Sequence, residues 1–187
     1  NYGDNDTFPL WNNQEVYNVR PDVRIMNTSY LGGEWYIDEM KTKANDAPGV
    51  PFSLPKSKYT FVNDLVPIYE RTDRTLDIRE VIDFVRSEDP RSKVRLDNGT
   101  PEGELADFIP TKRIALPVNK ENAIASGIVA EKDRDLIVDT VYLELKRNSL
   151  DKSQLMILDM LANFDWKRPI YLTQVYIMQD LGLLDYL

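Results

Sequence analysis

Two stretches in the first half of the chain show a clear periodicity of apolar and polar residues. Residues 22–27 alternate at every second position, which predicts a strand with one buried face. Within residues 76–85, apolar side chains recur at i, i+3, i+4 and i+7 from Ile78 onward, which predicts a helix with one apolar face. The chain therefore contains both strands and amphipathic helices.

Residues that favour helix starts mark two further helices. Asp6 or Thr7 can cap a helix that runs to about residue 19. Asp151 and Gln154 have the spacing of a capping box, in which each side chain bonds the backbone of the other residue. This box predicts a helix over residues 152–164.

Shorter apolar runs, separated by turn-forming residues, predict the remaining elements. A hairpin is expected in which residues 93–96 pair with residues 106–109, with its turn at Asp97-Asn98-Gly99. The other predicted strands are residues 65–69, 113–118, 136–145 and 170–173, and the other predicted helices are residues 34–41 and a short helix capped by Asn119.

The order of these elements predicts the fold class. Strands followed by loops and helices are typical of a parallel sheet with crossover helices. We expect one α/β domain over residues 1–187, with a largely parallel, Rossmann-like sheet flanked by helices and a small hairpin excursion. Open α/β sheets bind ligands at the carboxyl ends of their strands. The opening residues 3–7 would lie at such an end, after a first strand that is missing or truncated.

Composition excludes several functions. The chain carries 31 acidic and 23 basic residues, a formal net charge of -8, which argues against a nucleic-acid partner or an anionic membrane surface. It contains no cysteine and no histidine, so thiol chemistry, histidine acid–base chemistry and Cys/His metal sites are excluded. We expect no cofactor and no metal. Its longest apolar runs are far shorter than the roughly 18 residues that a membrane-spanning helix needs.

The opening sequence Gly3-Asp4-Asn5-Asp6-Thr7 is the first candidate site. Backbone N–H groups at a helix start suit a phosphate, and the acids and amide suit sugar hydroxyls. Alternating acids also occur in calcium loops, but the glycine at the sixth position and the glutamate at the twelfth are missing. The plainer interpretation is that Asp6 or Thr7 only caps the helix while Asp4 makes a local turn. Both interpretations remain open at this point.

Trp166, Lys167 and Arg168 form the second candidate site, between a predicted helix and a predicted strand. Two adjacent cations could hold a phosphate or carboxylate while the indole stacks on a sugar face. Alternatively, the cations interact with the negative end of the preceding helix and Trp166 fills the core. Paired carboxylates also occur, but a hydrolase would need two acids that face each other across a cleft.

Two long blocks of sequence carry a family resemblance. Residues 3–40 contain GDNDTFPLW, VRPDVRIMNTSYL and WYIDEM, and residues 149–173 read SLDKSQLMILDMLANFDWKRPIYLT. In this order the blocks resemble large Bacteroidetes membrane proteins of the domain-of-unknown-function 2723 family, which are similar to protein O-mannosyltransferases. The chain departs from that family at Gly32-Gly33, where Asn-Thr is usual.

The resemblance implies an extracytoplasmic, periplasmic accessory domain, which is a fragment of a membrane glycosyltransferase-like protein. The membrane-embedded half of the same polypeptide would anchor the domain and hold the catalytic centre, so no catalytic residue is expected here. The domain would hold a sugar or protein acceptor. The expected contacts are first Asp4, Asn5, Asp6 and Thr7, and then Trp166, Lys167 and Arg168.

The alternative is a structural or protein-interaction domain that binds no small ligand and docks on the membrane half or on another partner. A pocket with converging polar side chains would favour the first interpretation. A flat apolar patch made of Trp35, Tyr36 and residues 181–187 would favour the second.

Overall fold

The computed structural model describes residues 3–60, 64–96, 104–174 and 176–183. Its α-helices are α1 (Asp4–Tyr17), α2 (Glu34–Met40), α3 (Ile78–Arg86), α4 (Lys120–Ala125), α5 (Lys152–Ala162) and α6 (Tyr176–Asp180). Its strands are β1 (Leu65–Pro67), β2 (Leu76–Asp77), β3 (Lys93–Leu96), β4 (Glu104–Asp107), β5 (Arg113–Pro117), β6 (Thr140–Glu144) and β7 (Ser149–Asp151). Short 3-10 turns include η1 (Thr28–Gly32), η2 (Lys56–Lys58), η4 (Pro90–Ser92) and η5 (Glu131–Leu136).

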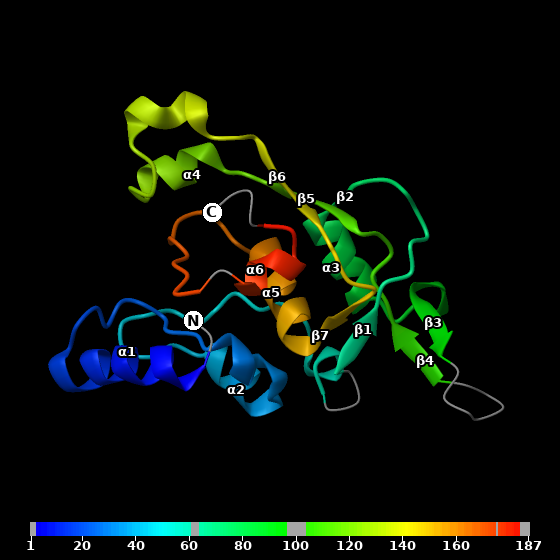
Figure 1. The fold of residues 1–187 in the computed structure, drawn as a ribbon, viewed down its shortest axis with the longest axis horizontal. Coiled ribbons are helices and arrows are strands. Elements are labelled where there is room, and N and C mark those ends of the chain that lie inside the picture. The colour runs from blue at the N-terminus through cyan, green and yellow to red at the C-terminus, as the bar shows by residue number, and fades with distance from the viewer. Residues whose placement is uncertain (1–2, 61–63, 97–103, 175, 184–187) are drawn as a thin grey trace.

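The strands form three small sheets (Figure 1). Strands β1 and β7 pair antiparallel, as do β3 and β4. The third sheet has the order β2-β5-β6, in which β2 and β5 are parallel and β5 and β6 are antiparallel. Mixed helix and strand content in one domain agrees with the α/β prediction.

The prediction of a largely parallel, Rossmann-like sheet is wrong. Among the described strands only β2 and β5 form a parallel ladder, and this ladder joins two residues on each strand. A parallel pair needs a long crossover connection, whereas antiparallel strands can be joined by short ones. Helix α3 follows β2, but the chain forms the β3–β4 hairpin before it reaches the parallel partner β5. Helix α4 and η5 then return the chain to β6, which is antiparallel to β5.

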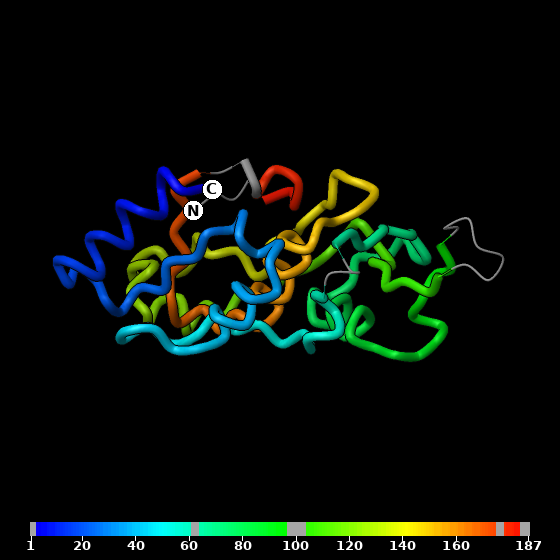
Figure 2. The backbone as a smooth tube through the Cα atoms, turned by 90° about the horizontal axis from the view of Figure 1, so that it is seen from below, coloured from blue at the N-terminus to red at the C-terminus, as the bar shows by residue number. Residues whose placement is uncertain are grey.

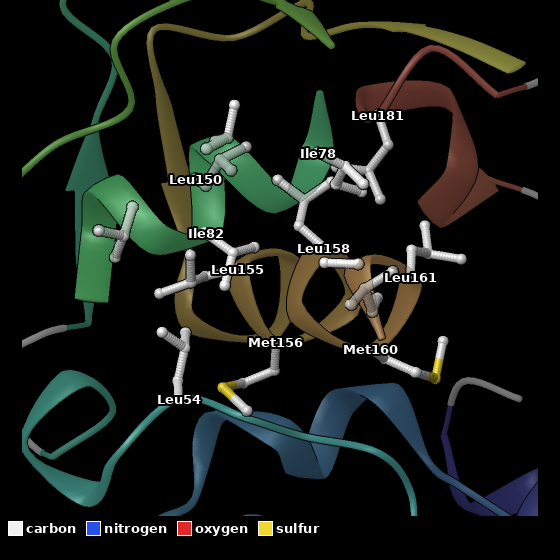
Figure 3. Packing of buried hydrophobic residues seen from close by; sticks show 14 of the residues in the cluster. Leu54, Ile78, Ile82, Leu150, Leu155, Met156, Leu158, Met160, Leu161 and Leu181 are labelled. Atoms are coloured by element: carbon white, nitrogen blue, oxygen red, sulfur yellow. The ribbon is translucent and has the colours of Figure 1, made fainter. Parts of the chain in front are cut away.

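Helix α5 forms the centre of the hydrophobic core. Leu155, Met156 and Leu158 have no exposed surface, and almost every residue of the helix is buried. Figure 3 shows α5 between α3 on one side and α2 on the other. Because the helix is buried on all sides, its apolar residues are spread around its whole circumference, and its polar residues Lys152, Gln154 and Asp159 are buried as well.

Several local predictions are confirmed. Asp151 caps α5 and forms the predicted capping box with Gln154. The Asn119 side chain accepts a hydrogen bond from the Asn122 N–H at the start of α4. Strands β3 and β4 form the predicted hairpin, but its second strand is Glu104–Asp107 rather than residues 106–109, so that Lys93 lies opposite Asp107. The predicted turn at residues 97–99 lies outside the described residues.

Two predicted strands and one predicted cap are wrong. Residues 22–27 are in no strand, and the Asn27 N–H donates to the hydroxyl of Tyr36 at 2.7 Å instead of joining a ladder. Residues 170–173 are also in no strand, and the Tyr171 side chain is 77% exposed. Helix α1 starts before Asp6 and Thr7, with Gly3 as its N-cap and no side-chain cap. β-Favouring residues form a strand only where a partner strand is available.

The molecule is elongated, with α1 at one end and the β3–β4 hairpin at the other (Figure 2). The segment that follows α5 runs back toward the start of α1, shown in orange in Figure 1. The two ends of the sequence that carry the family resemblance therefore lie together in space.

Candidate functional site

The opening residues of α1 contact other parts of the chain. The Gly3 N–H donates to Oδ1 of Asn27 at 3.1 Å, and the Tyr30 hydroxyl donates to the carboxylate of Asp4. The Asp4 carboxylate also raises the pKa of the Tyr30 hydroxyl, because it accepts the hydroxyl proton in this hydrogen bond. Asp4 thus joins the start of α1 to η1.

Asp6 joins α1 to the segment that follows α5. Its Oδ2 accepts hydrogen bonds from the Thr173 hydroxyl at 2.8 Å and from the Gln174 side-chain amide at 3.0 Å. Thr7 is fully buried, and its hydroxyl donates to the Gly3 carbonyl at 2.7 Å. Asn5 is exposed. Three of the four predicted contact residues are therefore engaged in internal hydrogen bonds, and a ligand role for the four stays a prediction.

Trp166, from the second predicted set, lies in the wall of a cleft of about 570 Å³. The residues that line this cleft, which we call the Trp166 cleft, are Arg79, Pro117, Val118, Asn119, Lys120, Glu121, Asn122, Phe164, Asp165 and Trp166. They come from the start of α3, from the turn between β5 and α4, and from the segment after α5. Three segments that are distant in sequence therefore build this cleft.

The geometry of Trp166 is fixed by contacts on both sides of the residue. Its φ is +62°, a left-handed conformation that is unfavourable for a bulky side chain. The indole Nε1–H donates to the Pro117 carbonyl at 3.2 Å, and the ring lies 4.9 Å from that of Phe164. The Asn122 side-chain amide donates to the Asp165 carbonyl at 2.7 Å. The indole packs against the core, as expected for a structural residue, and it also lines the cleft, as expected for a ligand contact. Features of both interpretations of Trp166 are therefore present.

Arg79 is the cation that sequence reasoning missed. Among the described residues its guanidinium makes one hydrogen bond, from Nε–H to the Ala162 carbonyl at 3.2 Å. Its two Nη groups are left to donate to a ligand in the cleft. The other charged groups are paired, Lys120 with Asp139 at 2.8 Å and Glu121 with Arg134. The hydrogen bond from Arg134 lowers the pKa of Glu121.

Lys167 and Arg168 do not line the Trp166 cleft. Lys167 is exposed, with Nζ 4.0 Å from the Asp165 carboxylate. Arg168 donates to the Pro48 carbonyl at 3.5 Å. The structure therefore separates Lys167 and Arg168 from the cleft that Trp166 lines. Arg79 supplies a cation to that cleft instead.

The flat apolar patch considered from sequence does not form among the described residues. Trp35 is exposed, but Tyr36 and Leu181 are almost fully buried in the core. Residues 184–187 lie outside the described residues. A second, smaller cleft lies beside Trp35, between α2, η2 and the start of α5. Within the described ranges no three acidic side chains gather in a way that could hold a metal ion.

These features define a mixed α/β domain with small, mostly antiparallel sheets around one buried helix and with two open clefts. In the part of the chain that the structure describes, no helix is long and apolar enough to cross a membrane. The chain belongs to the family described as TMEM260-associated domain 2, whose sequence model matches residues 1–187. No significant match was found among curated proteins or among solved structures.

Family membership agrees with the coarser part of the sequence interpretation. It links the chain with TMEM260, itself a proposed protein O-mannosyltransferase and thus a glycosyltransferase-like membrane protein. The narrower resemblance to the Bacteroidetes proteins stays a prediction.

Proposed function

We propose that this chain is an accessory domain of a glycosyltransferase-like membrane protein and holds a sugar or protein acceptor in the Trp166 cleft. In this proposal the membrane-embedded half of the same polypeptide supplies the catalytic centre and anchors the domain on the periplasmic side. The link to TMEM260 supports the connection with glycosyl transfer.

The observation that carries the proposal is the pre-organised aromatic wall of the cleft. Hydrogen bonds at Pro117 and Asp165 hold Trp166 and its segment in place in the free protein. A ligand that binds a pre-organised site loses less free energy to the ordering of side chains. The wall is thus suited to position an acceptor without first being ordered.

The chemistry of the lining suits an acceptor with both apolar and polar groups. The aromatic rings of Phe164 and Trp166 offer surface for a sugar face or an apolar peptide side chain. The Arg79 Nη groups can donate to a peptide carbonyl or carboxylate. Asn119 and Asn122 add amide groups to the lining.

An amide and indole NMR titration of the chain tests this proposal. The additions are short Ser/Thr peptides, mannose and mannose phosphate, and the reporters are the Trp166 indole N–H and the Arg79 Nε–H. We expect both signals to shift saturably at millimolar ligand concentration, which corresponds to a binding free energy of roughly −4 kcal/mol. Arg79→Gln should weaken binding, and Arg74→Gln, an exposed arginine outside the cleft, should not. An absence of shifts, or equal binding by both variants, would refute the proposal.

A second candidate function, docking on the membrane half, is supported by the surface of α1. Helix α1 buries only Thr7 and Gln14 among its residues. Val16 and Tyr17, at its end, are 66% and 67% exposed, and Phe8 is also exposed. Isolated exposed apolar residues are common, but several on one terminal helix indicate a contact surface.

Co-purification with the separately expressed membrane half tests this second candidate. Val16→Ser/Tyr17→Ser should abolish co-purification if α1 is the contact. Leu136→Ser/Val138→Ser, at two exposed apolar residues of another segment, is the matched control and should bind normally. Equal retention of both double variants would exclude α1 as the contact surface.

A further inference from the structure

The cleft beside Trp35 has the geometry of a second, separate binding site. It has a volume of about 460 Å³ and is lined by Gly32, Gly33, Glu34, Trp35, Asp38, Lys56 and Lys152. It shares no lining residue with the Trp166 cleft. An inference about it therefore does not depend on the function proposed above.

Trp35 provides a flat aromatic surface that is held from behind. The side chain is 64% exposed, yet its ring lies 5.4 Å from Tyr36 and 6.3 Å from Tyr30. Tyr36 is itself buried, and its hydroxyl accepts the Asn27 N–H at 2.7 Å. An exposed ring supported by the buried Tyr36 ring and the half-buried Tyr30 ring keeps its orientation in the absence of ligand, so stacking on it costs little ordering entropy.

Gly33 is required for this position of the indole. A Cβ at Gly33 would lie 2.8 Å from the indole Nε1 and 3.2 Å from its Cδ1. At the neighbouring Gly32, a Cβ would meet nothing within 4 Å. The indole thus packs directly over the backbone at Gly33, and any side chain there would displace it.

Asp38 provides a fixed, charged hydrogen-bond acceptor in the same cleft. Its Oδ2 accepts from Lys56 Nζ at 2.5 Å, and its Oδ1 accepts from the Tyr59 hydroxyl at 2.7 Å. The Tyr59 hydroxyl in turn accepts from Lys41 Nζ at 2.9 Å. The hydrogen bonds from Lys56 and then Tyr59 hold the pKa of Asp38 below its ordinary value, so the carboxylate is charged at neutral pH.

The charge of the lining argues against an anionic ligand. Lys56 is paired with Asp38, and Lys152 is paired with Asp64 at 2.7 Å. The Lys152 side chain is only 4% exposed, and its Nζ also donates to the Gly32 carbonyl at 3.2 Å. Both cations of the cleft are therefore paired with carboxylates. A phosphate or carboxylate would meet no unpaired cation here, whereas a neutral polyhydroxylated ligand would meet both donors and acceptors.

We propose that this cleft binds a neutral pyranose sugar. The C–H face of the sugar ring stacks on the exposed face of Trp35, its hydroxyls donate to the Asp38 carboxylate, and the Lys56 ammonium donates to a sugar oxygen. Aromatic surface combined with a few fixed polar groups is typical of small-molecule sites. The site would give the domain a glycan contact in addition to the acceptor cleft.

An indole NMR titration with neutral methyl glycosides tests the proposal. The probes are methyl α-D-mannopyranoside and methyl β-D-glucopyranoside, with inorganic phosphate as the anionic comparison. We expect at least one glycoside to shift the Trp35 indole N–H saturably at roughly millimolar concentration, in the weak-affinity range. Phosphate should leave that signal unchanged. The Trp166 indole reports on the other cleft, so the two proposals can fail separately.

Two variants and one matched control make the test specific. Gly33→Ala should weaken glycoside binding by roughly tenfold or more, equivalent to a change of 1.4 kcal/mol in binding free energy. Trp35→Ala, at an exposed position, should fold normally and lose binding. Tyr171→Ala, at an exposed aromatic residue outside the cleft, is the control and should bind like the unaltered chain. Absence of a Trp35 shift with either glycoside, equal binding by Gly33→Ala and Tyr171→Ala, or preferential binding of phosphate would overturn the proposal.

Discussion

The carboxylate of Asp6 accepts a hydrogen bond from the hydroxyl of Thr173 at 2.8 Å, across 167 positions of sequence. Asp6 lies in the first turn of α1, and Thr173 lies in the segment that follows α5. The two residues belong to the two sequence blocks that carry the family resemblance. The two blocks therefore contact each other in the structure. The Asp6 carboxylate joins the start of α1 to the segment that follows α5.

The first prediction concerns this contact. Asp6→Ala removes the acceptor for Thr173 and Gln174 without removing a helix cap, because Gly3 is the N-cap. We expect the free energy of unfolding to fall by about 1 kcal/mol, the usual net value of a partly exposed hydrogen bond. Urea unfolding measures this value. Asn5→Ala, at the exposed neighbour, is the control and should cause no comparable loss.

A double-mutant cycle distinguishes the contact from an effect on α1 alone. If Asp6 acts through Thr173, the losses caused by Asp6→Ala and Thr173→Val should overlap, so that the double variant is more stable than their sum predicts. Strictly additive losses would show that the hydrogen bond contributes nothing measurable.

The second prediction concerns Asp159, a fully buried acid on α5. Its carboxylate accepts the N–H groups of Ser53 and Leu54 at 2.6 and 2.9 Å, and also the Ser53 hydroxyl at 2.5 Å. Asp159→Ala leaves the buried Leu54 N–H without an acceptor and also removes both bonds to the exposed Ser53, so we expect a loss of roughly 3 kcal/mol. Thermal or urea unfolding checks this. Asp46→Ala, at an exposed acid, should be nearly neutral, and an equally small loss for Asp159→Ala would contradict the prediction.

The third prediction concerns Gly49. A Cβ at this position would lie 2.2 Å from the Lys41 carbonyl oxygen and 2.6 Å from its carbon. Both atoms belong to the backbone, and Val50 N–H donates to the neighbouring Met40 carbonyl at 2.8 Å, so the two segments cannot separate freely. Gly49→Ala should therefore cost about 1–3 kcal/mol, the range for overpacking. Urea unfolding measures this loss, and Gly32→Ala, where the added methyl group meets no neighbour within 4 Å, is the control. If the two variants have the same unfolding midpoint, the loop at Gly49 can adjust and the prediction is wrong.

Elements whose signals are local were predictable from the sequence. The Asp151–Gln154 capping box was found because both partners lie within one helical turn. The similar box formed by Asp77 and Glu80 at the start of α3 was missed, because residues 76 and 77 were assigned to the helix rather than to β2. Residues 22–27 have the alternation of a strand but no partner strand, and a sequence pattern cannot supply one.

The candidate clefts depended on long-range contacts that sequence reasoning could not reach. Trp166 was selected from its neighbours Lys167 and Arg168, but its partners in the cleft are Arg79 and the turn after β5. Trp35 was selected as part of an apolar patch, whereas the structure places polar side chains from α2 and η2 beside it. In both cases the residue type was informative, and its surroundings were determined by the tertiary fold.

The last prediction concerns pH. The Arg91 guanidinium, and then the Arg91 backbone N–H, donate to the Asp89 carboxylate and lower its pKa to about 2. A carboxylate whose pKa is lower in the folded state stabilises the protein fully above its unfolded pKa. This contribution is lost as the pH falls from about 4, the ordinary value for aspartate, toward 2. We expect the Asp89 carboxyl carbon to titrate near pH 2 by NMR.

Arg91→Gln provides the decisive variant for this titration. Because it removes the main cause of the shift and leaves the backbone N–H in place, the pKa of Asp89 should rise part of the way to its ordinary value. Arg134→Gln is the matched control: it should raise the pKa values of Glu121 and Glu131, which Arg134 lowers, and leave Asp89 unchanged. A pKa of Asp89 that is the same with and without the Arg91 guanidinium would show that the ion pair does not form in solution.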